Sequence, residues 1–147
     1  MEPRLDLITL GVRDLAVARA FYVDGLGWRP IFEVPGVVVF LQVGHGRALA
    51  LFGADALDVD SEIEPVDRAG FPPLSLAQVV DTQAEVRAVI DRARAAGARI
   101  VKEPQLADFG GFHAYFADPD GFRWEIATNP GWRVDPDGRV HLGPIGD

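Results

Sequence analysis

The residues best suited to chemistry lie between positions 110 and 130, in the segment GGFHAYFADPDGFRWEIATNP. Glu125 falls in a short run that alternates with bulky apolar residues, so as a strand it would face away from Phe122, Trp124 and Ile126. A carboxylate on an enclosed sheet face needs a cation, a hydrogen-bond donor or a proton. Glu125 could then act as a general base or bind a ligand group, whereas on an open face it would be an ordinary solvated side chain.

Other side chains could complete a site around Glu125. His113 is a second candidate base, or else a polar residue at a sheet edge. Arg123 shares the predicted face of Glu125, where it binds a ligand or simply pairs with the carboxylate and neutralises it. Aromatic rings provide apolar contact for small molecules, and the candidates for that role are Trp28, Phe40, Tyr115 and Trp124.

A hairpin must position these residues, and the elements before it are readable from hydrophobic periodicity. The turn residues Asp118 to Gly121 join two aromatic-rich strands. Before them we expect a strand at 73–80 and a helix that opens with a capping box of Thr82 and Glu85, followed by a strand at 98–103. The second half therefore has the order strand, helix, strand, strand, strand.

The first half has the same order. An apolar strand at 5–12 precedes Asp14, which caps a helix at about 15–23, and three strands follow at 28–34, 37–43 and 47–52. An acidic stretch without helical or strand periodicity follows and is interpreted as a linker. A repeated order of elements argues for two copies of one unit that share a site.

Composition excludes several classes of function. The chain of 147 residues is 48% hydrophobic and 24% charged, as in compact globular proteins. It has no cysteine, so no thiolate metal ligand or cysteine nucleophile is available. A net charge of −8 with a single lysine argues against binding to nucleic acid or anionic membranes. With no signal-like or spanning segment, we expect a cytoplasmic protein with a neutral or cationic ligand.

Several motifs resemble the vicinal oxygen chelate superfamily, which contains glyoxalases, extradiol dioxygenases, fosfomycin-resistance enzymes and bleomycin-resistance proteins. They are VRDL, GLGW, AAGARIVKEP and, most specifically, FADPDGFRWEI. The resemblance covers about residues 5 to 130 and implies an α+β fold of two tandem βαβββ modules whose mixed sheet curls into a cup. The expected parts of this compact domain are a first module at 4–53, an acidic linker at 54–72, a second module at 73–128 and a C-terminal extension at 129–147, similar to those of some small bacterial members.

The same resemblance implies where a metal would bind. The metal enzymes of the family take ligands from the first strand of each module and from the last strand of the first, positions that Leu7, Ser75 and Ala50 occupy here. Leucine and alanine cannot bind a cation and serine binds one poorly, so only Glu125 is left of the ligand set. We therefore expect no cofactor, with a divalent metal as the alternative.

Two classes of function follow from the resemblance. The first is a metal-free protein of the bleomycin-resistance kind, which binds a small cationic or aromatic molecule in the cup through Trp28, Phe40, Tyr115, Arg123 and Glu125. The alternative is an enzyme: either a metal-free one with Glu125 or His113 as general base, or a metal-dependent lyase, isomerase or dioxygenase. Relatives of this size pair in homodimers, and sheet edges at the module boundaries favour the same expectation.

Overall fold

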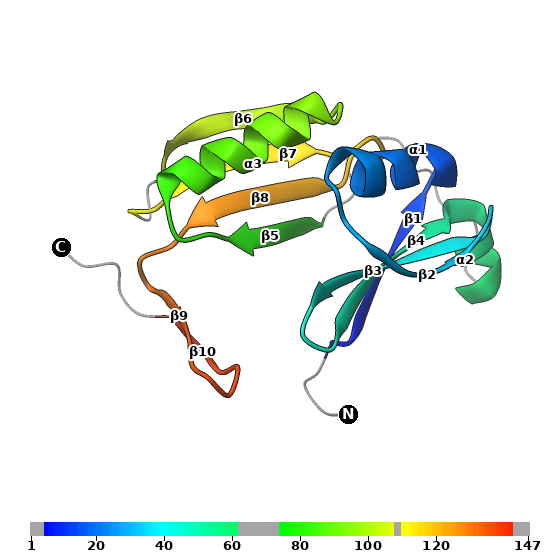
Figure 1. The fold of residues 1–147 in the computed structure, drawn as a ribbon, viewed down its shortest axis with the longest axis horizontal. Coiled ribbons are helices and arrows are strands. Elements are labelled where there is room, and N and C mark those ends of the chain that lie inside the picture. Colours follow the sequence, from blue (N-terminus) through cyan, green and yellow to red (C-terminus); the bar gives the residue numbers. More distant parts are fainter. Residues whose placement is uncertain (1–4, 62–73, 108–109, 143–147) are drawn as a thin grey trace. The chain divides into compact units, whose positions relative to one another are not determined.

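The computed structural model describes residues 5–61, 74–107 and 110–142. The chain divides into two compact units, each with one four-stranded sheet (Figure 1). The first unit comprises Met1–Pro72 and the turn Asp118–Gly121, and the second comprises Pro73–Ala117 and Phe122–Asp147. None of the described helices is long and apolar enough to cross a membrane.

The first unit has the predicted order of strands. Its elements are β1 (Leu7–Val12), α1 (Leu15–Arg19), the π-helix η1 (Ala20–Gly25), β2 (Pro30–Val34), β3 (Val38–Gly44), β4 (Arg47–Gly53) and α2 (Ala54–Ser61). The sheet order is β1-β4-β3-β2, with β1 parallel to β4 and the other pairs antiparallel. Asp14 caps α1 as predicted, because its carboxylate accepts hydrogen bonds from the backbone N–H groups of Ala16 and Val17.

Helix α2 differs from the sequence interpretation, which placed an acidic linker from residue 54. The helix is only eight residues long, and its apolar residues do not gather on one side. No helical period could therefore be recognised in the sequence. Ala54 is buried, and the side chain of Leu57 lies close to Gly11 of β1. Asp55 in the first turn interacts favourably with the helix dipole. The rest of the predicted linker, 62–72, lies outside the described residues. The other predicted module boundaries remain predictions.

The predicted first helix is α-helical for only half of its length and continues as η1. Its wider turns are closed by hydrogen bonds from Leu26 N–H to the Phe21 carbonyl and from Trp28 N–H to the Tyr22 carbonyl. Two consecutive aromatic side chains, Phe21 and Tyr22, are both buried here, with their rings in edge contact at 5.1 Å. Because π-turns hold an extra residue, the segment can direct both rings inward.

The second unit repeats the module and adds a hairpin. Its elements are β5 (Ser75–Val79), α3 (Gln83–Ala95), β6 (Arg99–Leu106), β7 (Phe112–Ala117), β8 (Arg123–Thr128), β9 (Trp132–Val134) and β10 (Val140–Leu142). The sheet order β5-β8-β7-β6 matches that of the first unit, with β5 parallel to β8. The fold is therefore α+β with two tandem βαβββ modules, as predicted. In the extension, β9 and β10 form a separate two-stranded sheet.

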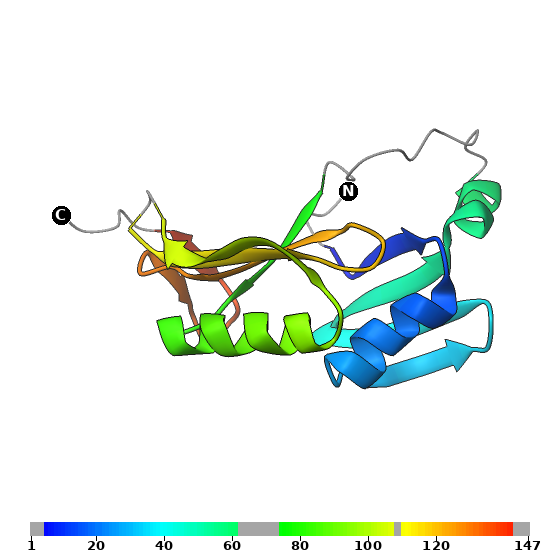
Figure 2. The same cartoon turned by 90° about the horizontal axis from the view of Figure 1, so that it is seen from above.

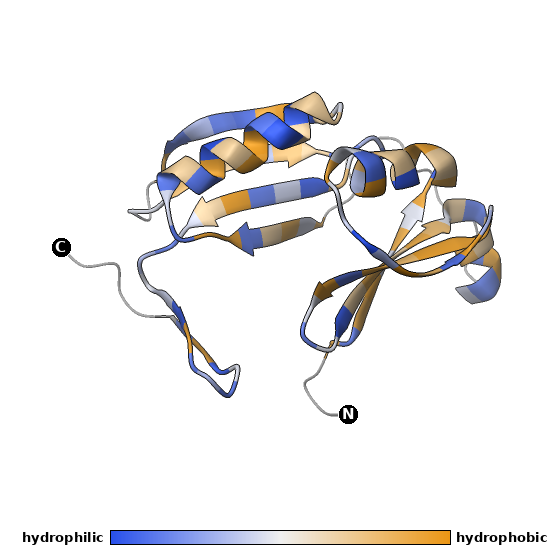
Figure 3. Cartoon of the chain, viewed as in Figure 1, coloured by the Kyte–Doolittle hydropathy of each residue, from blue (hydrophilic) through white to orange (hydrophobic). Residues whose placement is uncertain are grey.

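Helix α3 covers one face of the second sheet (Figure 2). The predicted capping box begins the helix: the Thr82 hydroxyl accepts from Glu85 N–H, and the Glu85 carboxylate accepts from Thr82 N–H. The apolar stripe of α3 is visible in Figure 3. Its buried residues and those of the covered sheet face are Val86, Ile90, Ala93, Leu76, Ala114, Phe116, Trp124 and Ile126. Alternation along β7 and β8 then directs Tyr115 and Glu125 to the opposite face.

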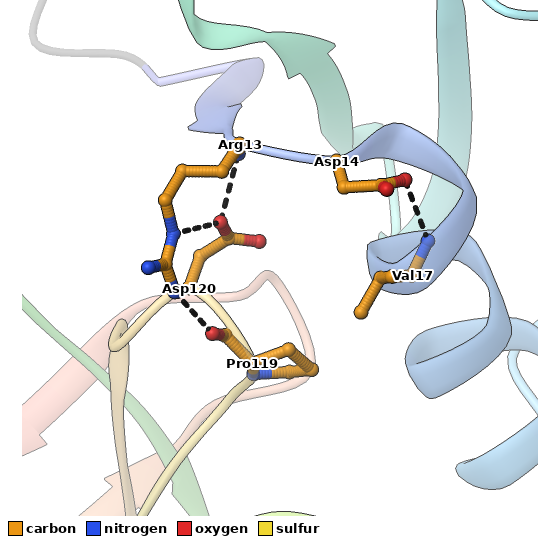
Figure 4. Close-up of a pocket in the computed structure, with 5 residues that line it drawn as sticks. All are labelled: Arg13, Asp14, Val17, Pro119 and Asp120. Carbon is orange, nitrogen blue, oxygen red and sulfur yellow. Dashed lines mark hydrogen bonds and ion pairs between the residues drawn. The ribbon is translucent and has the colours of Figure 1, made fainter.

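The turn Asp118–Gly121 is anchored within the first unit. The Tyr22 hydroxyl donates a 2.7 Å hydrogen bond to Asp118 Oδ2, and both side chains are buried. Arg13 donates its backbone N–H to Asp120 Oδ1 at 2.8 Å and a guanidinium N–H to the Pro119 carbonyl at 2.6 Å (Figure 4). Arg13, Pro119 and Asp120, together with Asp14 and Val17, line a pocket of about 200 Å³ (Figure 4).

Candidate functional site

Strand register brings the predicted site residues of the second unit to one face. Tyr115 pairs with Glu125 across β7 and β8, and His113 pairs with Ala127. On the other side of β8, Ala77 of β5 lies opposite Glu125. His113, Tyr115 and Glu125 thus project from neighbouring positions of the face that α3 does not cover.

A chain of three polar side chains runs across this face. His113 Nδ1 lies 3.1 Å from Glu125 Oε1, and His113 Nε2 lies 2.7 Å from Lys102 Nζ. An ionised carboxylate can only accept, so the geometry assigns the imidazole proton to Nδ1 and the lone pair to Nε2, which accepts from the ammonium of Lys102. The His113 side chain is only 10% exposed and that of Glu125 is 23% exposed. The partly buried Glu125 carboxylate is therefore stabilised by a hydrogen bond from His113 Nδ1–H, as its burial requires.

Tyr115 extends the chain on the other side of Glu125. Burial, together with the hydrogen bond to the Glu125 carboxylate and its negative charge, raises the pKa of the Tyr115 phenol to about 12, while Arg123 opposes the shift. The ring packs edge-on against His113, with ring centres 5.6 Å apart. At neutral pH the Tyr115 phenol therefore keeps its proton, donates a hydrogen bond to Glu125 and carries no negative charge.

We expect Tyr115 to ionise near pH 12, whereas an ordinary tyrosine ionises near pH 10.0. The folded state holds this proton more tightly than the unfolded chain, so its contribution to stability is present below pH 10 and is lost as the pH rises toward 12. Tyrosinate absorbance, recorded as the difference between the protein and its Tyr115→Phe variant, measures the step. A difference spectrum centred near pH 10 would contradict the burial and contact with Glu125.

The predicted site residues fall into two sets. His113, Tyr115, Arg123 and Glu125 belong to the second unit, and Trp28 and Phe40 belong to the first. The Trp28 ring lies 5.3 Å from that of Tyr22, and the Phe40 ring lies 6.2 Å from that of Phe32. Their roles toward a ligand remain predictions.

The suggestion that Trp124 contacts a ligand is wrong. Its side chain is buried on the face that α3 covers and stacks on Phe116, with ring centres 6.3 Å apart. Alternation along β8 already requires Trp124 and Glu125 to point in opposite directions, so only one of the two could face a ligand.

Sequence reasoning missed Lys102. This residue is half-buried on β6 and is the single lysine of the chain. Its sequence context, IVKEP, gives no sign that the side chain reaches His113. The one usable signal was its rarity: a protein that uses arginine at all of its other basic positions, histidine apart, keeps an amine at 102.

The donor set does not fit the family's divalent metal. Leu7 is 41% exposed at its position in β1, Ala50 is buried in β4, and Ser75 pairs with Arg123 at the start of β5. None of these three side chains is a strong ligand, and Glu125 is engaged by His113. Within residues 5–61, 74–107 and 110–142, no three His, Asp or Glu side chains gather as a metal site requires.

Comparison with known proteins agrees with this architecture. The Glyoxalase/Bleomycin resistance protein/Dioxygenase superfamily profile matches residues 4–126. A glyoxalase-related enzyme from Fulvimarina pelagi is 34% identical, with a TM-score of 0.85 over 97% of this chain and 99% of that one. No curated protein matches.

More distant structures share the fold alone. A lactoylglutathione lyase from Agrobacterium tumefaciens is 22% identical, with a TM-score of 0.65 over 87% of this chain and 95% of that one. A fosfomycin resistance protein from Mesorhizobium loti is 19% identical, with a TM-score of 0.63 over 88% and 94%. From the matched residues 4–126, together with the two modules of identical strand order, it follows that this chain belongs to the Glyoxalase/Bleomycin resistance protein/Dioxygenase superfamily.

Proposed function

We propose that this protein binds a small molecule at the face of the second sheet that α3 does not cover, without the help of a catalytic metal. The observation that carries the proposal is the hydrogen-bonded chain Lys102–His113–Glu125. Three ionisable side chains held together on one face cost desolvation that a purely structural sheet would avoid with apolar residues. Polar groups of this kind, fixed beside an aromatic ring such as Tyr115, are typical of ligand sites.

The contacts of Glu125 change the kind of ligand that we expect. The sequence suggested a cationic or aromatic ligand, since the chain is acidic overall and Glu125 was expected to face the ligand. Lys102 now adds an ammonium close to His113, and the Glu125 carboxylate already accepts from the imidazole. The group left to serve a ligand is therefore mainly a donor, the Lys102 ammonium with its remaining N–H groups, because the single O–H of Tyr115 already donates to Glu125. A neutral or anionic ligand with an acceptor oxygen fits it better than a cation does.

Three benzene derivatives of similar size but different charge test the proposal: benzoate, benzamide and benzylammonium. We expect benzamide or benzoate to shift the imidazole NMR signals of His113, which a His113→Asn variant identifies among the three histidines. The shift should persist in protein dialysed against EDTA, with less than one metal ion per chain by elemental analysis. Binding only after metal is restored would contradict the metal-free site, and a set of compounds that all leave His113 unmoved would contradict the site itself.

A second candidate function is a metal-independent enzyme with His113 as general base. The specific observation in its favour is the orientation of the imidazole: Glu125 holds the Nδ1 side, so Nε2, which accepts from Lys102, is the basic nitrogen. Such an enzyme would turn over in EDTA and lose activity in His113→Asn. Turnover that depends on added metal and survives His113→Asn would instead point to the lyase, isomerase or dioxygenase chemistry of metal-dependent relatives.

We further propose that the protein is a homodimer. The outer strand β2 exposes Ile31 and Phe32 by 56% and 59%, and open strand edges with apolar side chains are stabilised by a second copy. Light scattering at micromolar concentration should give twice the chain mass of 15.9 kDa. A mass of one chain, unchanged on concentration, would contradict this expectation.

A further inference from the structure

Lys102 stands in an arrangement that resembles the activation of a nucleophile. Its Nζ lies 2.7 Å from His113 Nε2, and the other ring nitrogen lies 3.1 Å from Glu125 Oε1. A nucleophile, a base within hydrogen-bond reach, and a carboxylate that orients the base are the three parts that activate side-chain nucleophiles in general. Here the atom next to the base is an amine nitrogen.

The surroundings of Lys102 do not match those of a structural lysine. Lysines on protein surfaces usually pair with carboxylates or extend into water. In the part of the chain that the structure describes, the recorded partner of the ammonium is the ring nitrogen of His113. Arg94 offers a contrast, because it pairs with both Asp91 and Glu103 near the same strand. A nearby carboxylate, Glu103, is thus used by an arginine and not by Lys102.

We propose that Lys102 is a nucleophilic lysine that forms a Schiff base with small aldehydes, with His113 as the base. This inference rests on the proposed ligand site and adds a covalent step to it. An acceptor oxygen that is a carbonyl would place its carbon beside the amine, and Tyr115 on the same face supplies an aromatic surface.

The step balances without any redox partner. The Lys102 ammonium gives one proton to His113 Nε2, and the resulting imidazolium is stabilised by the Glu125 carboxylate. The free amine attacks the aldehyde carbon, so that a C–N bond forms and the carbonyl π-bond breaks onto oxygen. That oxygen takes the proton back from His113 to give a carbinolamine. Loss of water from the carbinolamine then leaves the imine.

The chain itself makes the test unusually clear, because Lys102 and the N-terminal amine are its only amines. Intact protein would be incubated with benzaldehyde and cyanoborohydride, which reduces each imine to a stable benzylamine, and the rate at each amine would be followed by peptide mass spectrometry. The Arg139→Lys variant adds an amine at an exposed position of the β9–β10 hairpin and serves as the matched reference. Lys102→Arg retains the charge and should show no adduct in the peptide that contains residue 102.

We expect His113→Asn to slow modification of Lys102 by about 100-fold, the lower end of the range for general base catalysis. Glu125→Gln should slow it less, since the imidazole remains but loses its orienting charge. Modification of the N-terminal amine and of the amine from Arg139→Lys should be unaffected by either change. Unfolding temperatures of both variants separate a chemical effect from a loss of structure, because a merely structural contact would lower stability without changing the rate ratio between the two amines.

Lys102 reacting no faster than the amine from Arg139→Lys, or equally fast with and without His113, would overturn the inference. The outcome also separates this inference from the proposed function. If benzamide shifts His113 but no accelerated adduct forms at Lys102, the ligand site stands and the covalent step falls. If the adduct forms although no benzene derivative shifts His113, the nucleophile stands and the non-covalent site falls.

Discussion

Replacing Asp118 by alanine should destabilise the protein by about 3–6 kcal/mol, because at least two hydrogen bonds to a buried carboxylate are lost, at about 1.5–3 kcal/mol each. One is the 2.7 Å bond from the Tyr22 hydroxyl, and the other is the 3.0 Å bond from Asp120 N–H. Asp118 is 5% exposed and Tyr22 is fully buried, so water cannot replace the lost partner. Urea unfolding of the variant measures the difference.

Two smaller substitutions separate the contributions of the individual hydrogen bonds to this loss of stability. Tyr22→Phe removes only the first bond and should cost about 1.5–3 kcal/mol, and Asp118→Asn retains an acceptor and should cost less than Asp118→Ala. Asp91 is the control: its side chain is 73% exposed, and Asp91→Ala should change stability by less than about 0.5 kcal/mol. Equal effects of Asp91→Ala and Asp118→Ala would show that the turn is not anchored through this carboxylate.

Glu125→Gln should weaken binding of a benzene derivative at the site by about 1.5–3 kcal/mol, or roughly 10–150-fold in Kd. The amide retains the shape of the carboxylate but not its charge, so the hydrogen bond from His113 Nδ1–H becomes a weaker, neutral one. The His113–Lys102 pair that we expect to serve the ligand is then held less firmly.

Glu103→Gln is the charge-matched control for this experiment. Glu103 lies on β6 of the same sheet and pairs with Arg94, away from His113. Its substitution changes the net charge of the protein by the same amount and should leave Kd unchanged. Calorimetry of both variants with benzamide or benzoate provides the comparison. Similar losses for the two variants would mean that only the overall charge matters, and full affinity in Glu125→Gln would remove the carboxylate from the site.

Much of the fold could be read from the sequence because local signals agreed with each other. The Asp14 cap and the capping box of Thr82 and Glu85 are both present. The turn residues Asp118 to Gly121 connect β7 and β8 as their types predicted. Such signals depend on a few neighbouring residues, whereas η1 and α2 depend on tertiary contacts such as those of Tyr22 and Leu57. The periodicity of the chain could not reveal either element.

Three of the four side chains of the polar site were predictable for the same reason. His113, Tyr115 and Glu125 lie on regular strands, where period-two alternation fixes the face. Lys102 lies on an irregular strand: from Lys102 to Gln105, β6 advances three residues while its partner β7 advances two, from Tyr115 to His113. An extra residue of this kind changes which side chains point to a given face. The direction of Lys102 therefore follows from the paired strands and could not be inferred from β6 alone.

The parallel pairing of the first and last strand of each module also sets the order in which the sheet can assemble. Leu7 of β1 pairs with Ala48 of β4, and Ser75 of β5 pairs with Arg123 of β8. In each module a helical segment and two strands lie between the paired strands in the sequence. The hairpins β2–β3–β4 and β6–β7–β8 need only short loops and can form early. During synthesis β1 and β5 therefore stay unpaired until β4 and β8 have emerged from the ribosome. Of all the strands in these two sheets, the first strand of each module is thus exposed longest to wrong pairing.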